Sequence, residues 1–326
     1  MNYLGKHIID IDHIDRDFIE NIFSITQRLK TQNKLKKPFD NKNICTLFFE
    51  DSTRTRLSFE KASNNLKANF HNLDLSTSSV NKGESFFNTI KTVESIGMDI
   101  YIIRHGSSGA AMFAAKNLRG TVINAGDGSH DHPTQALSDL FTIKEQKKDF
   151  TKLEISIVGD FLFSRVARSN ILALLKMGSK VNILGPPELS SPKISDAYDQ
   201  YNSLYPGNLK FYNELKQPLI NSDIIMALRI QKERFNKETK VDLENYKSKW
   251  RIDKELLDQC KKNILIMHPG PMNEELEISH NVAHSDFSLI NKQVENGVFV
   301  RPVSYTHLRA HETREDRGWG GGGCKK

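Results

Sequence analysis

Five arginines stand just after predicted β-strands, where parallel sheets present their ligand-binding loops. They are Arg54, Arg56, Arg104, Arg165 and Arg229, and the polar side chains of His132, Gln135, Gln231 and His268 occupy similar positions. In open parallel sheets, ligands bind outside the carboxyl ends of the strands. A single arginine in a loop is usually solvated, but a series of guanidinium groups at strand ends predicts a pocket for several negative charges.

A cradle for phosphate is predicted in residues 51–60, which read DSTRTRLSFE. Here a strand runs into a Ser/Thr-rich turn that opens a helix, where free backbone N–H groups and the helix dipole favour an anion. The hydroxyls of Ser52, Thr53 and Thr55 add donors, and the guanidinium of Arg54 matches the geometry of phosphate. The alternative is a helix-capping serine beside surface arginines. The Gly-rich GxxxxGK[ST] pattern of nucleotide-binding loops is absent.

Short β-type runs alternate with helical patterns along the chain, which is the signature of parallel α/β architecture. We therefore expect two doubly wound parallel-sheet domains joined by bridging helices. The expected strands are residues 44–49, 99–103, 121–125, 153–158, 180–184, 223–227 and 263–267, and the expected helices are 53–67, 110–117, 133–147 and 164–177. The helix at 133–147 has a proline in its first turn, which suits a helix start, and it is the candidate bridge.

The composition favours a cytoplasmic enzyme. At about 150 residues per domain, the 326 residues indicate two domains. No apolar run approaches about 18 residues and no basic head precedes an apolar stretch, so neither a membrane span nor a secretory signal is expected. The three cysteines form no CxxC pair and the histidines show no ligand spacing, so no metal site is expected. The net charge of +6 leaves a nucleic-acid-binding module as a distant alternative, but both signs of charge are interspersed.

Five segments resemble, in the same order, the motifs of the aspartate/ornithine carbamoyltransferase family. They are residues 52–56 (STRTR), 78–84 (SSVNKGE), 132–137 (HPTQAL), 229–234 (RIQKER) and 268–273 (HPGPMN). The last two resemble the aspartate branch of the family, and the HCLP motif of the ornithine branch is absent. The resemblance runs from about Gly5 to Arg301.

The resemblance implies transfer of the carbamoyl group from carbamoyl phosphate to the amine of L-aspartate, giving N-carbamoyl-L-aspartate and phosphate. This is a step of de novo pyrimidine biosynthesis, and it requires no cofactor. Two alternatives remain open. One is a sister carbamoyltransferase acting on another amine such as ornithine, and the other is a catalytically impaired, truncated form of the enzyme.

The resemblance also implies a role for each residue of the site. The residues that would bind carbamoyl phosphate are Ser52, Thr53, Arg54, Thr55, Arg104, His132 and Gln135, with the backbone carbonyls of Gly270 and Pro271 facing its nitrogen. The catalytic residues would be Arg54, Thr55, Arg104, His132 and Lys82. The residues that would bind aspartate are Lys82, Arg165, Arg229 and Gln231. Ser78 and Lys82 belong to a loop that, in the family, enters the site of a neighbouring subunit. A homotrimer with shared sites is therefore expected, and an association with regulatory chains is left open.

The expected domains are a carbamoyl-phosphate-binding domain at 1–134 and an aspartate-binding domain at 135–286. The family has a final helix that returns to the first domain. We expect Pro302 to end this helix after Arg301, with residues 302–326 forming a non-native tail that is neither helix nor strand. Loss of the helix would remove buried apolar side chains and destabilise the chain. A further departure is Glu274-Glu275, where the aspartate branch often has Arg-Gly.

Overall fold

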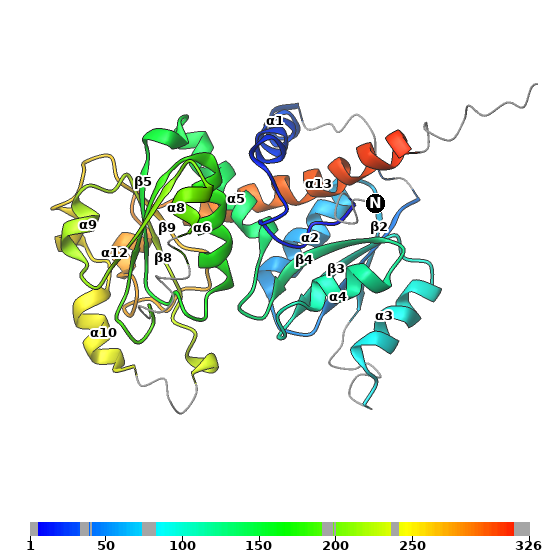
Figure 1. Cartoon of the computed structure of the whole chain (residues 1–326), viewed down its shortest axis with the longest axis horizontal. Helices are drawn as coiled ribbons and strands as arrows, with labels where there is room; N and C mark the ends of the chain where they lie inside the picture. The colour runs from blue at the N-terminus through cyan, green and yellow to red at the C-terminus, as the bar shows by residue number, and fades with distance from the viewer. Residues whose placement is uncertain are drawn as a thin grey trace, which may run out of the picture. The chain divides into compact units, whose positions relative to one another are not determined.

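A computed structural model describes the chain at residues 6–32, 39, 41–73, 83–190, 198, 200–235 and 241–315, with only the backbone described for 304–315. The chain divides into two compact units (Figure 1). Unit 1 comprises Met1–Thr134 and Gly297–Lys326, and unit 2 comprises Gln135–Asn296. Among the described residues, no helix is both long and apolar enough to cross a membrane.

Unit 1 is built on a four-stranded parallel sheet in the order β2-β1-β3-β4. The strands are β1 (Asn43–Phe48), β2 (Asn69–Leu73), β3 (Ile100–His105) and β4 (Thr121–Asp127), and the helices are α1 (Arg16–Gln32), α2 (Thr53–Asn65), α3 (Phe86–Ser95) and α4 (Ala110–Asn117). The face that carries Cys45, Leu47 and Tyr101 packs against apolar side chains of α3 and α4. Helices α1 and α2 lie on the other side of the sheet (Figure 1).

Unit 2 is built on a five-stranded parallel sheet in the order β7-β6-β5-β8-β9. The strands are β5 (Glu154–Val158), β6 (Lys180–Leu184), β7 (Asn208–Tyr212), β8 (Ile224–Ala227) and β9 (Leu265–Met267). The helices are α5 (Pro133–Gln146), which begins in unit 1, α6 (Arg165–Met177), α8 (Tyr201–Leu204), α9 (Lys216–Ile220), α10 (Leu243–Trp250), α11 (Lys254–Leu257) and α12 (His280–Ala283), with short 3-10 turns η3 (Phe150–Lys152) and η4 (Lys232–Arg234). The core on one face joins strand residues such as Ile225 and Ile266 to Trp250 of α10 and Val282 of α12. The two sheets confirm the expected α/β class with two parallel-sheet domains.

Each sheet has one point at which the strand order reverses. In unit 1 the chain moves outward from β1 to β2 and then continues on the other side with β3 and β4, so the reversal lies between β1 and β3. In unit 2 it lies between β5 and β8. Ligands of open α/β sheets bind at the carboxyl ends of the strands beside such a reversal. The loops that follow β1, β3, β5 and β8 are therefore the places to look for a site.

The edge strands β2 and β7 were not predicted from the sequence. Strand β2 reads NFHNL and has no fully buried residue, and β7 reads NLKFY and buries only Leu209. An edge strand with so few buried side chains carries no hydrophobic run that could reveal it. The other seven strands, which include the edge strands β4 and β9, were predicted to within two residues at each end, because each of them has at least two buried residues.

The closing helix α13 (Ile290–Glu315) runs through Pro302, so the expected end of the helix at Arg301 is wrong. A proline inside a helix removes one backbone hydrogen bond and usually bends or breaks the helix. Here the side chains around the proline are buried: Val300 is 0%, Arg301 3% and Val303 0% exposed. The Arg301 guanidinium also lies 5.2 Å from the ring centre of Phe59 on α2. Packing of this turn onto unit 1 therefore offsets the local cost of the proline.

Candidate active site

The start of α2, where the sequence predicts a phosphate cradle, follows β1 directly. Ser52 is the N-cap of the helix, in extended conformation, and its Oγ accepts a hydrogen bond from the Thr55 N–H at 3.4 Å. An oxygen that accepts here still has its own hydrogen to donate. Thr55 is buried, whereas Thr53 and Arg54 are exposed. The first turn of a helix and the positive end of its dipole favour an anion, so the geometry is compatible with the predicted cradle.

Arg104 stands at the carboxyl end of β3, on the other side of the strand reversal. It is the register partner of Phe48 at the end of β1, and its backbone C=O accepts from the Phe49 N–H at 2.8 Å. Its guanidinium donates to the Ala125 C=O at 3.2 Å and lies 3.9 Å from the Glu50 carboxylate. The side chain is only 15% exposed. Because β1 and β3 are paired in the sheet, the position of Arg104 relative to the turn at 49–55 is fixed.

His132 lies between β4 and α5 and is 3% exposed. Asp127, which no sequence pattern marks, shapes the loop that leads to His132. The fully buried Asp127 carboxylate accepts from the backbone N–H of Gly109 at 2.7 Å and of Asp131 at 3.2 Å. It also lies 3.1 Å from Nδ1 of His130, and this hydrogen bond raises the pKa of that imidazole. Hydrogen bonds to the buried Asp127 carboxylate therefore hold the loop that leads to His132.

In unit 2, Asp160 connects the loops that follow β5 and β8. Its carboxylate accepts from the Phe163 N–H and from the Gln231 N–H, each at 3.0 Å. The Gln231 side chain donates in turn to the Phe163 C=O at 3.0 Å. Arg165, the first residue of α6, follows the same loop and is 6% exposed. The structure thus places Arg165 and Gln231 on two linked loops at the strand reversal.

Arg229 is engaged by a carboxylate of its own chain. Its two terminal nitrogens donate to the two Glu233 oxygens at 2.5 and 3.1 Å. This bidentate geometry is the one that a guanidinium uses to bind a free carboxylate. The Arg229 side chain is 29% exposed, so it remains accessible to a ligand that competes with Glu233.

The turn after β9 is shaped by His268. This residue is fully buried, its backbone N–H donates to Gln293 Oε1 at 2.9 Å, and its Nδ1 accepts from the Gly270 N–H at 2.8 Å. The following Gly270–Pro271 peptide is cis, and Gly270 has a φ of 62°, a conformation that glycine adopts readily. The backbone carbonyls of this turn are thus held in a defined conformation.

Gln135 belongs to a buried network of hydrogen bonds. Its Nε2 donates to Asp139 at 2.9 Å, and the same carboxylate accepts from Gln293 at 2.8 Å and from Asn170 at 2.9 Å. Through Gln293 the network reaches the backbone of His268. Gln135, on α5, is thereby connected to the turn that carries Gly270. The predicted residues Ser78 and Lys82 lie outside the described residues.

Comparison with known proteins identifies related chains along most of both units. Residues 6–145 match the family model "Aspartate/ornithine carbamoyltransferase, carbamoyl-P binding domain", and residues 151–302 match its "Asp/Orn binding domain". The chain is 41% identical to the aspartate carbamoyltransferase catalytic subunit of Ruminiclostridium cellulolyticum, covering 92% of this chain and 94% of that one. It is 40% identical to the subunit of the same name from Acetivibrio thermocellus, covering 96% and 97%.

Solved structures show the same fold. Aspartate transcarbamoylase from Trypanosoma cruzi in complex with carbamoyl phosphate and aspartate superimposes with a TM-score of 0.82 at 26% identity, covering 92% of this chain and 94% of that chain. The catalytic subunit of the M. Jannaschii enzyme gives a TM-score of 0.80 at 32% identity, covering 94% and 99%.

Proposed function

The chain belongs to the aspartate/ornithine carbamoyltransferase family, and on that premise we propose that it transfers the carbamoyl group of carbamoyl phosphate to L-aspartate. The products are N-carbamoyl-L-aspartate and phosphate. The observation that carries the proposal is the 41% identity, over 92% of the chain, to a relative named aspartate carbamoyltransferase catalytic subunit. The RIQKER segment at 229–234 and the lack of an HCLP motif favour aspartate over ornithine as the amine.

Unit 1 binds carbamoyl phosphate in this proposal. The N-terminal turn of α2, with Ser52, Thr53, Arg54 and Thr55, holds the phosphate, and this role is supported by the position of the turn at the positive end of the helix dipole. Arg104 and His132 contact the carbamoyl group. The amine of aspartate attacks the carbamoyl carbon and forms a tetrahedral oxyanion. The C–O bond to phosphate then breaks, and the departing phosphate accepts the proton that the amine loses.

The chemistry needs no covalent intermediate on the protein. Positive and N–H donors around the oxyanion lower the barrier because they stabilise charge that develops only in the transition state. Thr55, Arg104 and His132 serve this purpose, and each of them is buried or mostly buried before any substrate binds. Preorganised donors of this kind typically contribute about 10²–10³ in rate for each group.

Unit 2 binds aspartate in this proposal. Arg165, Arg229 and Gln231, with Lys82, recognise its two carboxylates. The pairing of Arg229 with Glu233 supports this role, since the guanidinium already holds one carboxylate in bidentate geometry. A substrate carboxylate takes the place of Glu233 when aspartate binds. The resemblance of segment 78–84 supports a homotrimer in which Ser78 and Lys82 complete the site of a neighbouring subunit. We also propose that the enzyme acts in pyrimidine synthesis and is located in the cytoplasm.

The test is amine-dependent release of phosphate from carbamoyl phosphate. L-Aspartate should stimulate release and L-ornithine should not. An Arg54→Ala variant should lose activity at every aspartate concentration, whereas an Arg229→Ala variant should recover part of it at high aspartate. Stimulation by ornithine alone would assign the chain to the sister activity.

A further inference from the structure

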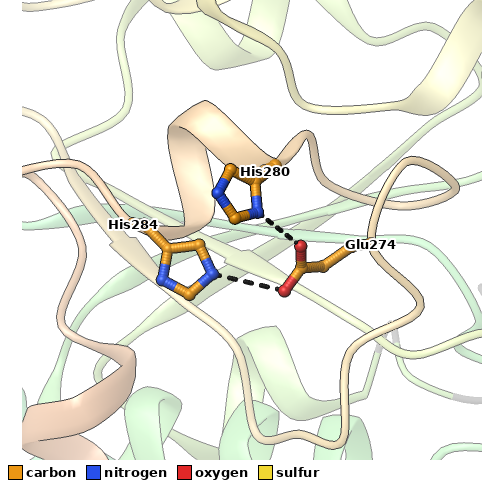
Figure 2. A group of neighbouring side chains, drawn as sticks. All are labelled: Glu274, His280 and His284. Atoms are coloured by element: carbon orange, nitrogen blue, oxygen red, sulfur yellow. Dashed lines mark hydrogen bonds and ion pairs between the residues drawn. The ribbon is translucent and has the colours of Figure 1, made fainter.

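Two histidines and a glutamate meet on the surface of unit 2, outside the site described above. Figure 2 shows the carboxylate of Glu274 facing the imidazoles of His280 and His284. Glu274 Oε2 lies 2.7 Å from His280 Nδ1, and Oε1 lies 3.2 Å from His284 Nε2. One nitrogen of each ring and one carboxylate oxygen all lie within 4.8 Å of one another.

The local fold holds these three side chains in place. His280 is the first residue of α12 and His284 is its C-cap, and this spacing of four residues puts both rings on one face of the helix, with centroids 4.5 Å apart. Val282 and Ala283, between them, are buried in the core and fix the opposite face of the helix. The loop that carries Glu274 pairs with Ile278 as an isolated bridge. The positions of the three residues are therefore fixed by the packing of α12 and by the backbone pairing of the loop, and not by their side-chain contacts alone.

Ion pairing by itself accounts poorly for this arrangement. All three residues are exposed, and exposed ion pairs contribute about 0–1 kcal/mol. In the part of the chain that the structure describes, the carboxylate of Glu274 pairs with the two imidazoles and with no lysine or arginine. The neighbouring Glu275, by contrast, pairs with Arg251 at 3.0 Å.

We propose that Glu274, His280 and His284 form a binding site for a divalent transition-metal ion of the zinc type. Two imidazole nitrogens and one carboxylate oxygen are donors that zinc accepts, at about 2.0–2.2 Å, with a fourth position left for water. The nitrogens that now donate to Glu274 become the ligands, because each ring moves its hydrogen to its other nitrogen when the ion binds. The ion connects α12 to the loop that follows the 268–271 turn, so its binding stabilises this part of unit 2.

The test is calorimetric titration with zinc chloride. His307 and His311 have the same spacing in the sequence, so the titration uses a full-length background in which both are replaced by alanine. We expect one ion per chain and a rise in melting temperature with zinc. Glu274→Gln and His284→Ala should each weaken binding at least ten-fold. His71→Ala, which removes an exposed histidine of unit 1, should leave the affinity unchanged.

Cobalt(II) provides a second measurement. It should show visible d–d absorption bands in the background protein and lose them in Glu274→Gln. This variant keeps the shape of the side chain, so it decides the question even where His284→Ala folds poorly. The proposal is overturned when the background protein binds no stoichiometric zinc, or when Glu274→Gln and a folded His284→Ala bind it as tightly as the background does. Neither result bears on carbamoyl transfer.

Discussion

The carboxylate of Asp160 accepts a hydrogen bond from the backbone N–H of Gln231, 71 residues further along the chain, at 3.0 Å. Its second oxygen accepts from the Phe163 N–H, so one buried side chain joins the loops after β5 and β8. Burial raises the pKa of this carboxyl group, and the two N–H donors oppose that rise. Asp160 is thus a positioning residue for the loops that carry the aspartate-binding side chains.

Replacing Asp160 with Asn should therefore impair aspartate binding selectively. The amide keeps the size of the side chain but presents an NH₂ group to one of the two backbone donors. An unsatisfied buried group costs about 1–3 kcal/mol, so we expect the KM for aspartate to rise about ten-fold. The KM for carbamoyl phosphate should change little. Steady-state kinetics with each substrate varied in turn measures this, with Asp149→Asn, an exposed carboxylate of the same unit, as control. Equal rises in both KM values would contradict a local positioning role.

Glu233 should compete with substrate for Arg229. An exposed ion pair contributes about 0.2–1 kcal/mol, so removing its charge in Glu233→Gln should lower the KM for aspartate by up to about five-fold. Arg229→Ala should raise the same KM. Both are measured in the steady-state assay at saturating carbamoyl phosphate. A higher KM in Glu233→Gln would show that Glu233 orients the guanidinium for the substrate instead of competing with it.

The stability of unit 1 should fall below neutral pH because of His7. Its Nδ1 accepts a hydrogen bond from the Val122 N–H at 3.0 Å, and burial, with a smaller contribution from Lys6, lowers its pKa to about 4. Between pH 6.5 and about 4 the unfolded chain binds a proton that the folded chain does not, so stability falls as the pH falls through this window. The loss reaches at most about 3 kcal/mol.

His7→Asn tests this dependence because its side-chain oxygen accepts the same hydrogen bond without titrating. Thermal melts from pH 7.5 to 4 should show a smaller fall in Tm for the variant than for the unchanged protein. Parallel curves for the two proteins would show that His7 does not cause the effect.

Shared sites predict that two inactive variants restore each other. Lys82→Ala lacks the residue given to the neighbour, and Arg54→Ala lacks a residue of the receiving site. When the two variants are dissociated and reassembled together, about one site in four combines an intact Arg54 with an intact Lys82 from its neighbour. We expect each variant alone to be nearly inactive and the mixture to regain about a quarter of full activity. A mixture no more active than the separate variants would indicate sites built within one chain.

The central strands and the helices after them were predictable because both depend on strong local patterns. Residues 180–184 and 110–117 coincide with β6 and α4 at both ends. Strands β2 and β7 were missed because few of their side chains are buried, which leaves little apolar signal. The rule that proline ends a helix predicted a break at Pro302. The helix continues there because the burial of Val300 and Val303 offsets the cost of the proline. Contacts between distant parts of the chain decided these cases.

The sequence also placed the side chains at the strand ends, since the carboxyl ends of parallel strands gather at one edge of a sheet. It did not reveal Asp127 and Asp160, because an isolated aspartate in a loop carries no pattern. The expectation that the histidines show no metal-ligand spacing overlooked His280 and His284, which lie four residues apart. The approach of Glu274 to them depends on the fold of its loop.

The central claim is tested most directly by a single competition reaction. The protein is given carbamoyl phosphate with L-aspartate and L-ornithine at equal concentrations, and the carbamoylated products are quantified by mass spectrometry. The account predicts N-carbamoyl-L-aspartate with no carbamoylated ornithine, and no product from Arg54→Ala. Carbamoylated ornithine as the main product, or no product from a folded protein, would contradict it.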